Sequence, residues 1–132
     1  MPLELRVRFA ETDQMSVAHH SAYIVWLEAA RIEWLRERGL DYRNLEEAGV
    51  SLAVSAVSVQ YLRSSYFDDL LTIDATMTEL RSRRVRFRYT VSREGVTVAT
   101  GESLHTPVNS GGHTVRLPGV WLGALQNHLL TP

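Results

Sequence analysis

The segment from Glu11 to His20 carries the residues best suited to chemistry. It places the carboxylate of Asp13 and the imidazoles of His19 and His20 just ahead of an apolar run. If that run is a buried helix, its free N–H groups and the positive end of its dipole can hold an oxyanion. A carboxylate beside them could attack a carbonyl group or activate water to do so. A helix cap followed by two surface histidines would fit the same spacing.

A second concentration of charge consists of five arginines between positions 81 and 88. Arg84, Arg86 and Arg88 alternate with apolar residues, which predicts a solvated outer face of a strand. Arg81 and Arg83 fall on the turn before that strand, where they could bind phosphates in a bidentate manner. The net charge is 14 − 15 = −1, so nucleic acid is a poor partner and a phosphorylated small molecule fits better.

Other chemistries find little support in the sequence. The chain has no cysteine, which excludes disulfides, thiolate metal sites and cysteine nucleophiles. No His-x-x-x-His pair, glycine-rich phosphate loop or Gly-x-Ser-x-Gly elbow is present, and we expect no metal. Asp68 and Asp69 indicate a solvated turn. The three remaining histidines stand alone and are predicted to be structural or exposed: His105, His113 and His128.

One long helix must position Asp13 and the two histidines. Residues 3–9 alternate as a half-buried strand does, and residues 10–20 show neither period and should form a loop. Ser21 can cap a helix that runs to Arg38 and ends at Gly39. The first turns of this helix are apolar on every face, which predicts that a sheet wraps them and buries them on every side.

The pattern of the remaining residues predicts mainly strands. A short helix or turn over 41–48 precedes strands over 50–61, 71–78, 85–91 and 96–106. A change of phase at Ala56–Val57 predicts a bulge or a strong bend in the first of these strands. Glu94-Gly95 should form a hairpin turn, residues 109–113 a glycine-rich turn, and residues 118–130 a terminal helix. Consecutive antiparallel strands with a segregated helix predict an α+β fold.

Length and composition fit one globular domain. The chain has 132 residues, of which 45% are hydrophobic and 22% charged, so we predict a single domain over 1–132. No apolar run approaches the roughly 20 residues that span a bilayer, so we expect no membrane partner. The start lacks a basic segment followed by an apolar one, which predicts a cytoplasmic protein.

Several motifs in the right order carry a family resemblance over nearly the whole chain, from Arg6 to about Pro118. The most specific stretch reads Arg-Phe-Ala-Glu-Thr-Asp over 8–13 and continues through Val17, His20 and Tyr23 to Trp-Leu-Glu-Ala-Ala-Arg over 26–31. Supporting it are Tyr-Phe-Asp-Asp-Leu over 66–70, Ala-Thr-Gly-Glu over 99–102 and Val-Arg-Leu-Pro over 115–118. With these motifs the chain resembles the hotdog-fold acyl-CoA thioesterases of the 4-hydroxybenzoyl-CoA thioesterase type.

The resemblance implies thioester hydrolysis in a hotdog fold, where a curved antiparallel sheet wraps one long helix. Asp13 matches the family's catalytic carboxylate, as nucleophile or general base, and His20 matches the position whose backbone N–H polarises the thioester carbonyl. The side chain of His20 is itself a catalytic candidate. The substrate-binding residues expected around them are Met15, Val17, His19 and Tyr23.

The coenzyme A portion of the substrate is expected at Arg81 and Arg83, which match the turn that binds its phosphates. No cofactor is expected, since coenzyme A is part of the substrate. Sites in this family lie between subunits, so the resemblance implies a homo-oligomer, either a dimer or, as we favour, a homotetramer.

Two other functions stay open. A hotdog dehydratase acting on 3-hydroxyacyl thioesters needs an acid and a base around C2 and C3, and the surroundings of Asp13 resemble thioesterases more closely. A catalytically silent acyl-CoA-binding or scaffold protein would keep the fold without the reaction, but it has no obvious use for a carboxylate at Asp13. The acyl group, and the choice between coenzyme A and acyl carrier protein, are left open.

Overall fold

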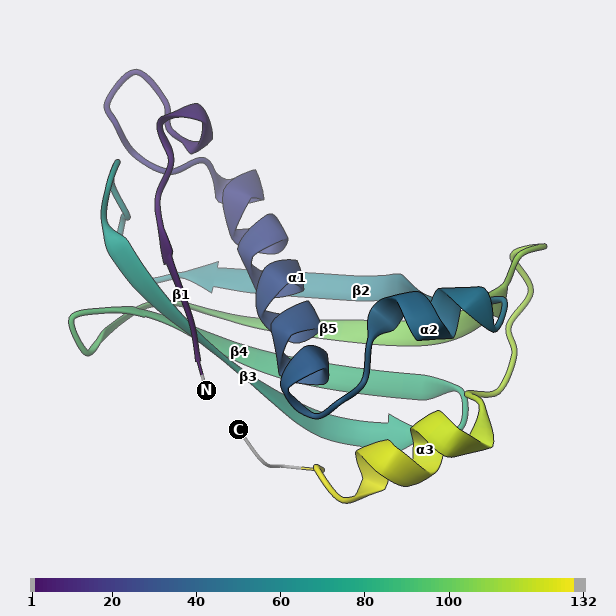
Figure 1. The fold of residues 1–132 in the computed structure, drawn as a ribbon. Coiled ribbons are helices and arrows are strands. Elements are labelled where there is room, and N and C mark those ends of the chain that lie inside the picture. The colour runs from purple at the N-terminus through teal and green to yellow at the C-terminus, as the bar shows by residue number, and fades with distance from the viewer. Residues whose placement is uncertain (1, 130–132) are drawn as a thin grey trace.

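A curved antiparallel sheet holds one long helix against its inner face in the computed structural model, which describes residues 2–129 (Figure 1). The sheet has five strands in the order β1-β3-β4-β5-β2. Their bounds are β1 Leu3–Arg6, β2 Val50–Tyr61, β3 Leu70–Arg81, β4 Arg84–Arg93 and β5 Val96–Asn109. The helices are the 3₁₀ turn η1 Phe9–Glu11, then α1 His20–Glu37, α2 Tyr42–Glu47 and α3 Gly119–Gln126. The predicted α+β architecture is confirmed.

The core lies between α1 and the inner faces of β3, β4 and β5. Alternate residues of β3 and β4 are buried, as their period-two patterns predict. Gly101 on β5 lets the helix approach closely, because a Cβ atom there would lie 2.7 Å from Cδ1 of Leu27. The buried side chains that fill this layer include Leu27, Trp34, Leu35, Leu71, Ile73, Met77, Val85, Phe87 and Tyr89.

Helix α1 differs from its prediction at its start and on its outer face. The N-cap is His19 and the first helical residue is His20, so Ser21 is not the cap. The helix ends as predicted near Gly39, whose φ of +77° is the left-handed conformation that glycine adopts freely. Ile24 and Val25 are exposed, so the first half is not buried on every side. The sheet covers one face of this first half, and nothing within residues 2–129 buries Ile24 and Val25 on the other.

The remaining boundaries shift by a few residues. The bulge in β2 lies between Val54 and Ala56, slightly before the predicted position. Strand β1 ends at Arg6, and the chain then forms η1. The hairpin at Glu94-Gly95 and the turn at 109–113 form as predicted. Helix α3 ends at Gln126, while the last predicted residue, position 130, lies outside the described residues. In the described part of the chain, no helix is long and apolar enough to cross a bilayer.

Candidate active site

Asp13 lies on an exposed loop that leads into α1. Its Oδ1 accepts hydrogen bonds from the backbone N–H groups of Met15, at 2.8 Å, and Val17, at 3.1 Å. The Asp13 N–H donates to the Val17 carbonyl at 2.9 Å and closes the loop. These donors, helped by the charge of nearby His19, hold the pKa of the Asp13 carboxyl below its ordinary value. Within residues 2–129 the second oxygen, Oδ2, has no hydrogen-bond partner, so an ionised oxygen faces solvent.

The start of α1 presents unsatisfied donors next to this loop. The N-cap, His19, makes no side-chain capping bond, and the N–H groups of His20 and Ser21 find no acceptor within residues 2–129. The His20 ring stacks on the Tyr61 ring with centroids 4.4 Å apart, and the Tyr61 hydroxyl donates to the His20 carbonyl at 3.0 Å. Strand β2 therefore fixes the first turn of the helix. Free N–H groups at a helix start are suited to binding an oxyanion.

A cavity of about 170 Å³ opens beside this helix start. The structure brings three predicted site residues to its wall, namely Val17, His20 and Tyr23. The Tyr23 hydroxyl donates to Oγ of buried Ser65 at 3.0 Å, which fixes the ring in place. The other lining residues are Ala18, Tyr61, Leu62, Arg63 and Ser64. Sequence reasoning missed those from 61 to 64, because a strand end and the following loop carry no motif that places them against a helix 40 residues earlier.

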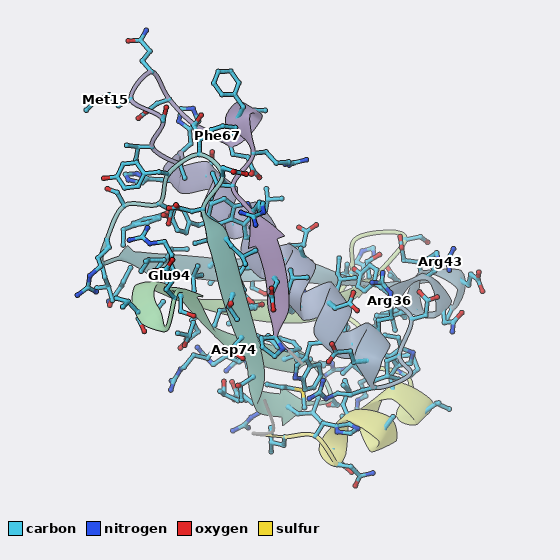
Figure 2. The ribbon with its side chains drawn as sticks, turned by 60° about the vertical axis from the view of Figure 1, so that its left-hand side comes forward. Met15, Arg36, Arg43, Phe67, Asp74 and Glu94 are labelled. Atoms are coloured by element: carbon cyan, nitrogen blue, oxygen red, sulfur yellow. The ribbon has the colours of Figure 1, made fainter. Side chains whose placement is uncertain are left out.

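Two predicted substrate-binding residues do not line this cavity. Met15 is 79% exposed and stands at the tip of the loop, near Phe67 (Figure 2). His19 is exposed and acts on Asp13 through its charge. Both are neighbours of Asp13, and all three residues lie outside the cavity wall.

Residues 7–125 match the thioesterase-like superfamily. The chain belongs to this superfamily. The acyl-CoA thioester hydrolase YbgC of Escherichia coli O6:H1 is 30% identical over 83 residues, which are 63% of this chain and 62% of that protein. The alignment therefore spans less than two thirds of that relative's length.

Solved structures share the fold of this chain. A hypothetical protein of Thermus thermophilus, TT1821, is 38% identical, with a TM-score of 0.91 over 96% of this chain and 98% of that one. A DHNA-CoA thioesterase of Staphylococcus aureus is 24% identical, with a TM-score of 0.92 over 96% of this chain and 88% of that one, and shows the same fold. The predicted family and hotdog fold are confirmed, and the names of the superfamily relatives support the predicted enzyme class.

The two arginines expected to bind phosphate lie far from Asp13 in the same chain. The Leu70 end of β3 adjoins the Asp13 loop, because the Phe67 N–H donates to the Ser16 carbonyl at 2.9 Å. Arg81 is at the other end of this 12-residue strand, and Arg83 lies in the turn beyond it. At about 3.3 Å per residue the two ends are roughly 35 Å apart. Figure 1 shows this turn beside α3, at the opposite end of the sheet from the loop.

A second polar cluster lies inside the core, away from the cavity. The Nε2 atom of His105 is 2.7 Å from Oγ of Ser103 and 3.4 Å from Nη1 of Arg31, and the Tyr89 hydroxyl is 2.7 Å from the same Oγ. His105 is fully buried, as a structural histidine should be. Burial, and then the charge of Arg31, lower the pKa of His105 to about 3.

Among the described residues, no group of three histidine or acidic side chains could hold a metal ion.

Proposed function

We propose that this protein hydrolyses acyl-CoA thioesters with Asp13 as the catalytic carboxylate. The observation that carries this proposal is the free, ionised Oδ2 of Asp13 on the loop that leads to the unsatisfied N–H groups of His20 and Ser21. A thioester needs both features, a carboxylate for its carbonyl carbon and donors for its carbonyl oxygen. Membership of the thioesterase-like superfamily supports the same conclusion.

The reaction uses these groups in a fixed order. The thioester carbonyl accepts hydrogen bonds at the start of α1, and the bonds strengthen as its oxygen becomes negative in the transition state. Asp13 then either attacks the carbonyl carbon or removes a proton from the attacking water. In the first case a mixed anhydride forms, coenzyme A leaves as the thiolate, and water cleaves the anhydride. Both routes give the free acid and coenzyme A, and coenzyme A enters as part of the substrate, so no cofactor takes part.

The cavity beside His20 is proposed to receive the part of the substrate nearest the thioester. Val17 and Tyr23 form part of its wall, while Met15 and His19 lie outside it, next to Asp13. The test is thiol release from a panel of short, long and aromatic acyl-CoA esters. A silent binder would be stabilised thermally by these esters without cleaving them, and a dehydratase would convert 3-hydroxyacyl esters to enoyl esters without releasing thiol. Acyl-CoA substrates also fit the cytoplasmic location that the sequence predicts.

A homo-oligomer is proposed because one long sheet edge lacks a partner in the described chain. Strand β2 lies at the edge of the sheet, and its 12 residues include no charge and no proline. Isolated edge strands are usually short or protected by lysine, proline or bulges, and of these features β2 has only the bulge between Val54 and Ala56. Val54 on β2 is 52% exposed, and Ile24 and Val25 on α1 are exposed as well. A second copy that pairs along β2 would bury such apolar groups.

Val54→Lys is expected to convert the oligomer into smaller species. A lysine on an unpaired edge strand opposes strand addition, because pairing with a second copy would remove its charge from water. Size-exclusion chromatography with light scattering measures the change in mass. Val96→Lys is the matched control, because Val96 is similarly exposed and lies at the far end of β5, at the hairpin. An unchanged mass for Val54→Lys, or an equal change in the control, would rule out β2 as the interface.

Arg81 and Arg83 are proposed to bind the substrate phosphates from a second subunit, because within one chain they are too far from Asp13. Arg83 is exposed and has no ion pair within residues 2–129, whereas Arg81 pairs with Glu79 at 3.0 Å. Arg83→Gln should raise KM for acyl-CoA by about tenfold, the value of one charge-assisted hydrogen bond, and leave kcat unchanged. The same acyl group on pantetheine, which lacks the nucleotide phosphates, should show no change in KM. An equal effect on both esters would contradict a phosphate contact.

A further inference from the structure

We propose that Glu11 is a positioning residue that holds the Asp13 loop against the start of α1. The inference rests on the proposed function, because it assigns a role in the reaction to a residue that does not touch the substrate. Glu11 lies two residues before Asp13 in the sequence and ends η1. Its side chain is only 10% exposed, which is unusual for a carboxylate and requires an explanation.

Three hydrogen bonds satisfy the Glu11 carboxylate. Its Oε1 accepts from the Arg8 backbone N–H at 2.8 Å, and its Oε2 accepts from Trp26 Nε1 at 2.9 Å and from Arg8 Nη2 at 3.2 Å. Trp26 is buried in α1, beyond its first turn. The bond to Trp26 therefore joins the loop directly to the body of the helix.

The backbone of Glu11 adds a second attachment at the start of the same helix. Its carbonyl accepts from the N–H of His19, the N-cap, at 2.8 Å. The two ends of the segment 11–19 thus meet, and a bridge between Thr12 and Ala18 continues the pairing inside it. Asp13 follows directly within this closed segment. Glu11 is consequently attached to α1 at two points, through its backbone at the start of the helix and through its side chain at Trp26.

The charge state of Glu11 suits this role. Burial opposes ionisation, but the bonds from Arg8 and Trp26 outweigh it and hold the pKa of the Glu11 carboxyl below its ordinary value. An ionised carboxylate accepts all three bonds. A glutamine offers one oxygen and one NH₂ group, so it must lose acceptance from either Arg8 or Trp26. Because a displacement of about 1 Å at a reacting group can reduce a rate by 100-fold, a modest loosening here should be visible in turnover.

The experiment weakens the attachment of the loop to α1 from each side. Trp26→Phe deletes the Nε1 donor and keeps an aromatic ring, and Glu11→Gln keeps the size of the acceptor. Each variant should lower kcat by about tenfold while KM changes less than twofold, since the substrate still binds. The losses in the double variant should be less than additive, because both changes weaken the same attachment of the loop to α1. Trp121→Phe on α3 is the control for loss of a buried indole elsewhere in the core.

A pH profile separates positioning from simple destabilisation. Loosening the loop weakens the N–H bonds from Met15 and Val17 to Asp13, so the acid limb of kcat/KM should move to higher pH by about half a unit or more. The proposal is overturned if kcat and the acid limb stay unchanged in Glu11→Gln and Trp26→Phe. It is also overturned if Glu11→Gln and Trp26→Phe lower kcat no more than Trp121→Phe does for the same decrease in melting temperature. A wild-type protein that cleaves no ester of the panel removes the proposed function, and this inference falls with it.

Discussion

Asp13→Asn is expected to lower kcat/KM for every acyl-CoA that the wild-type protein cleaves by at least about 100-fold. Asparagine has the same shape as aspartate, and its Oδ1 can still accept from the N–H groups of Met15 and Val17. The loop should therefore keep its conformation. Only the charge and the basicity of Oδ2 are lost, and these are what the proposed attack on the carbonyl carbon requires. Thiol release at saturating and limiting substrate measures the effect.

Asp68→Asn is the matched control for this variant. Asp68 is an exposed carboxylate near the same end of the sheet, and its positive φ of 69° is a conformation that asparagine also tolerates. The control should retain wild-type kcat/KM.

In the wild-type protein, activity should fall as pH decreases through the lowered pKa of Asp13, and stay constant from neutral pH down to about pH 5. Equal hydrolysis by wild type and Asp13→Asn would show that the carboxylate is elsewhere.

Features encoded by local periodicity could be predicted from the sequence. The alternation in β3 and β4 indicated which residues face the core, and Glu94-Gly95 and Gly39 marked the ends of elements. Both glycines adopt a positive φ that few other residues accept. The Asp13 loop could be found because a polar segment without either period precedes an apolar helix. These patterns depend only on neighbours in the sequence.

Features that depend on contacts between distant segments could not be predicted. The apolar residues Ile24 and Val25 read as core, yet they face away from the sheet, because hydrophobicity does not say which partner covers a helix face. Arg81 and Arg83 were expected to bind the phosphates of the substrate that Asp13 attacks, and within one chain the length of β3 separates them from Asp13. The bond between Glu11 and Trp26 spans 15 residues and has no sequence signal beyond the two residue types.

His105 gives the second large expected effect, a loss of stability as pH decreases from 7 to 5. The folded protein keeps His105 neutral, with a pKa of about 3, because the ring is fully buried beside the Arg31 guanidinium. In the unfolded chain the same histidine has its ordinary pKa of about 6.5. Between these two values the unfolded state binds a proton that the folded state does not. Stability therefore increases with pH in this window and is lost as pH falls below about 6.5.

The size of this effect follows from the difference in pKa. Between pH 7 and pH 5 the free energy of unfolding should decrease by about 2 kcal/mol, and by about 4 to 5 kcal/mol if acidification continues to pH 3. The carboxylates with lowered pKa, such as Glu11 and Asp13, also destabilise the fold on protonation, but only near and below pH 4.5. The interval from pH 7 to pH 5 therefore reports mainly on His105.

His105→Gln should remove most of the pH dependence between pH 7 and pH 5. Glutamine places a neutral polar group near the position of Nε2, where it can still accept from Ser103 and Arg31, and it does not titrate. Denaturant unfolding at each pH gives the slope, independently of any change in absolute stability. His113→Gln, in the exposed turn before α3, should keep the wild-type slope. If His105→Gln keeps that slope too, another group takes up the proton on unfolding, and the buried histidine is not what makes the core sensitive to acid.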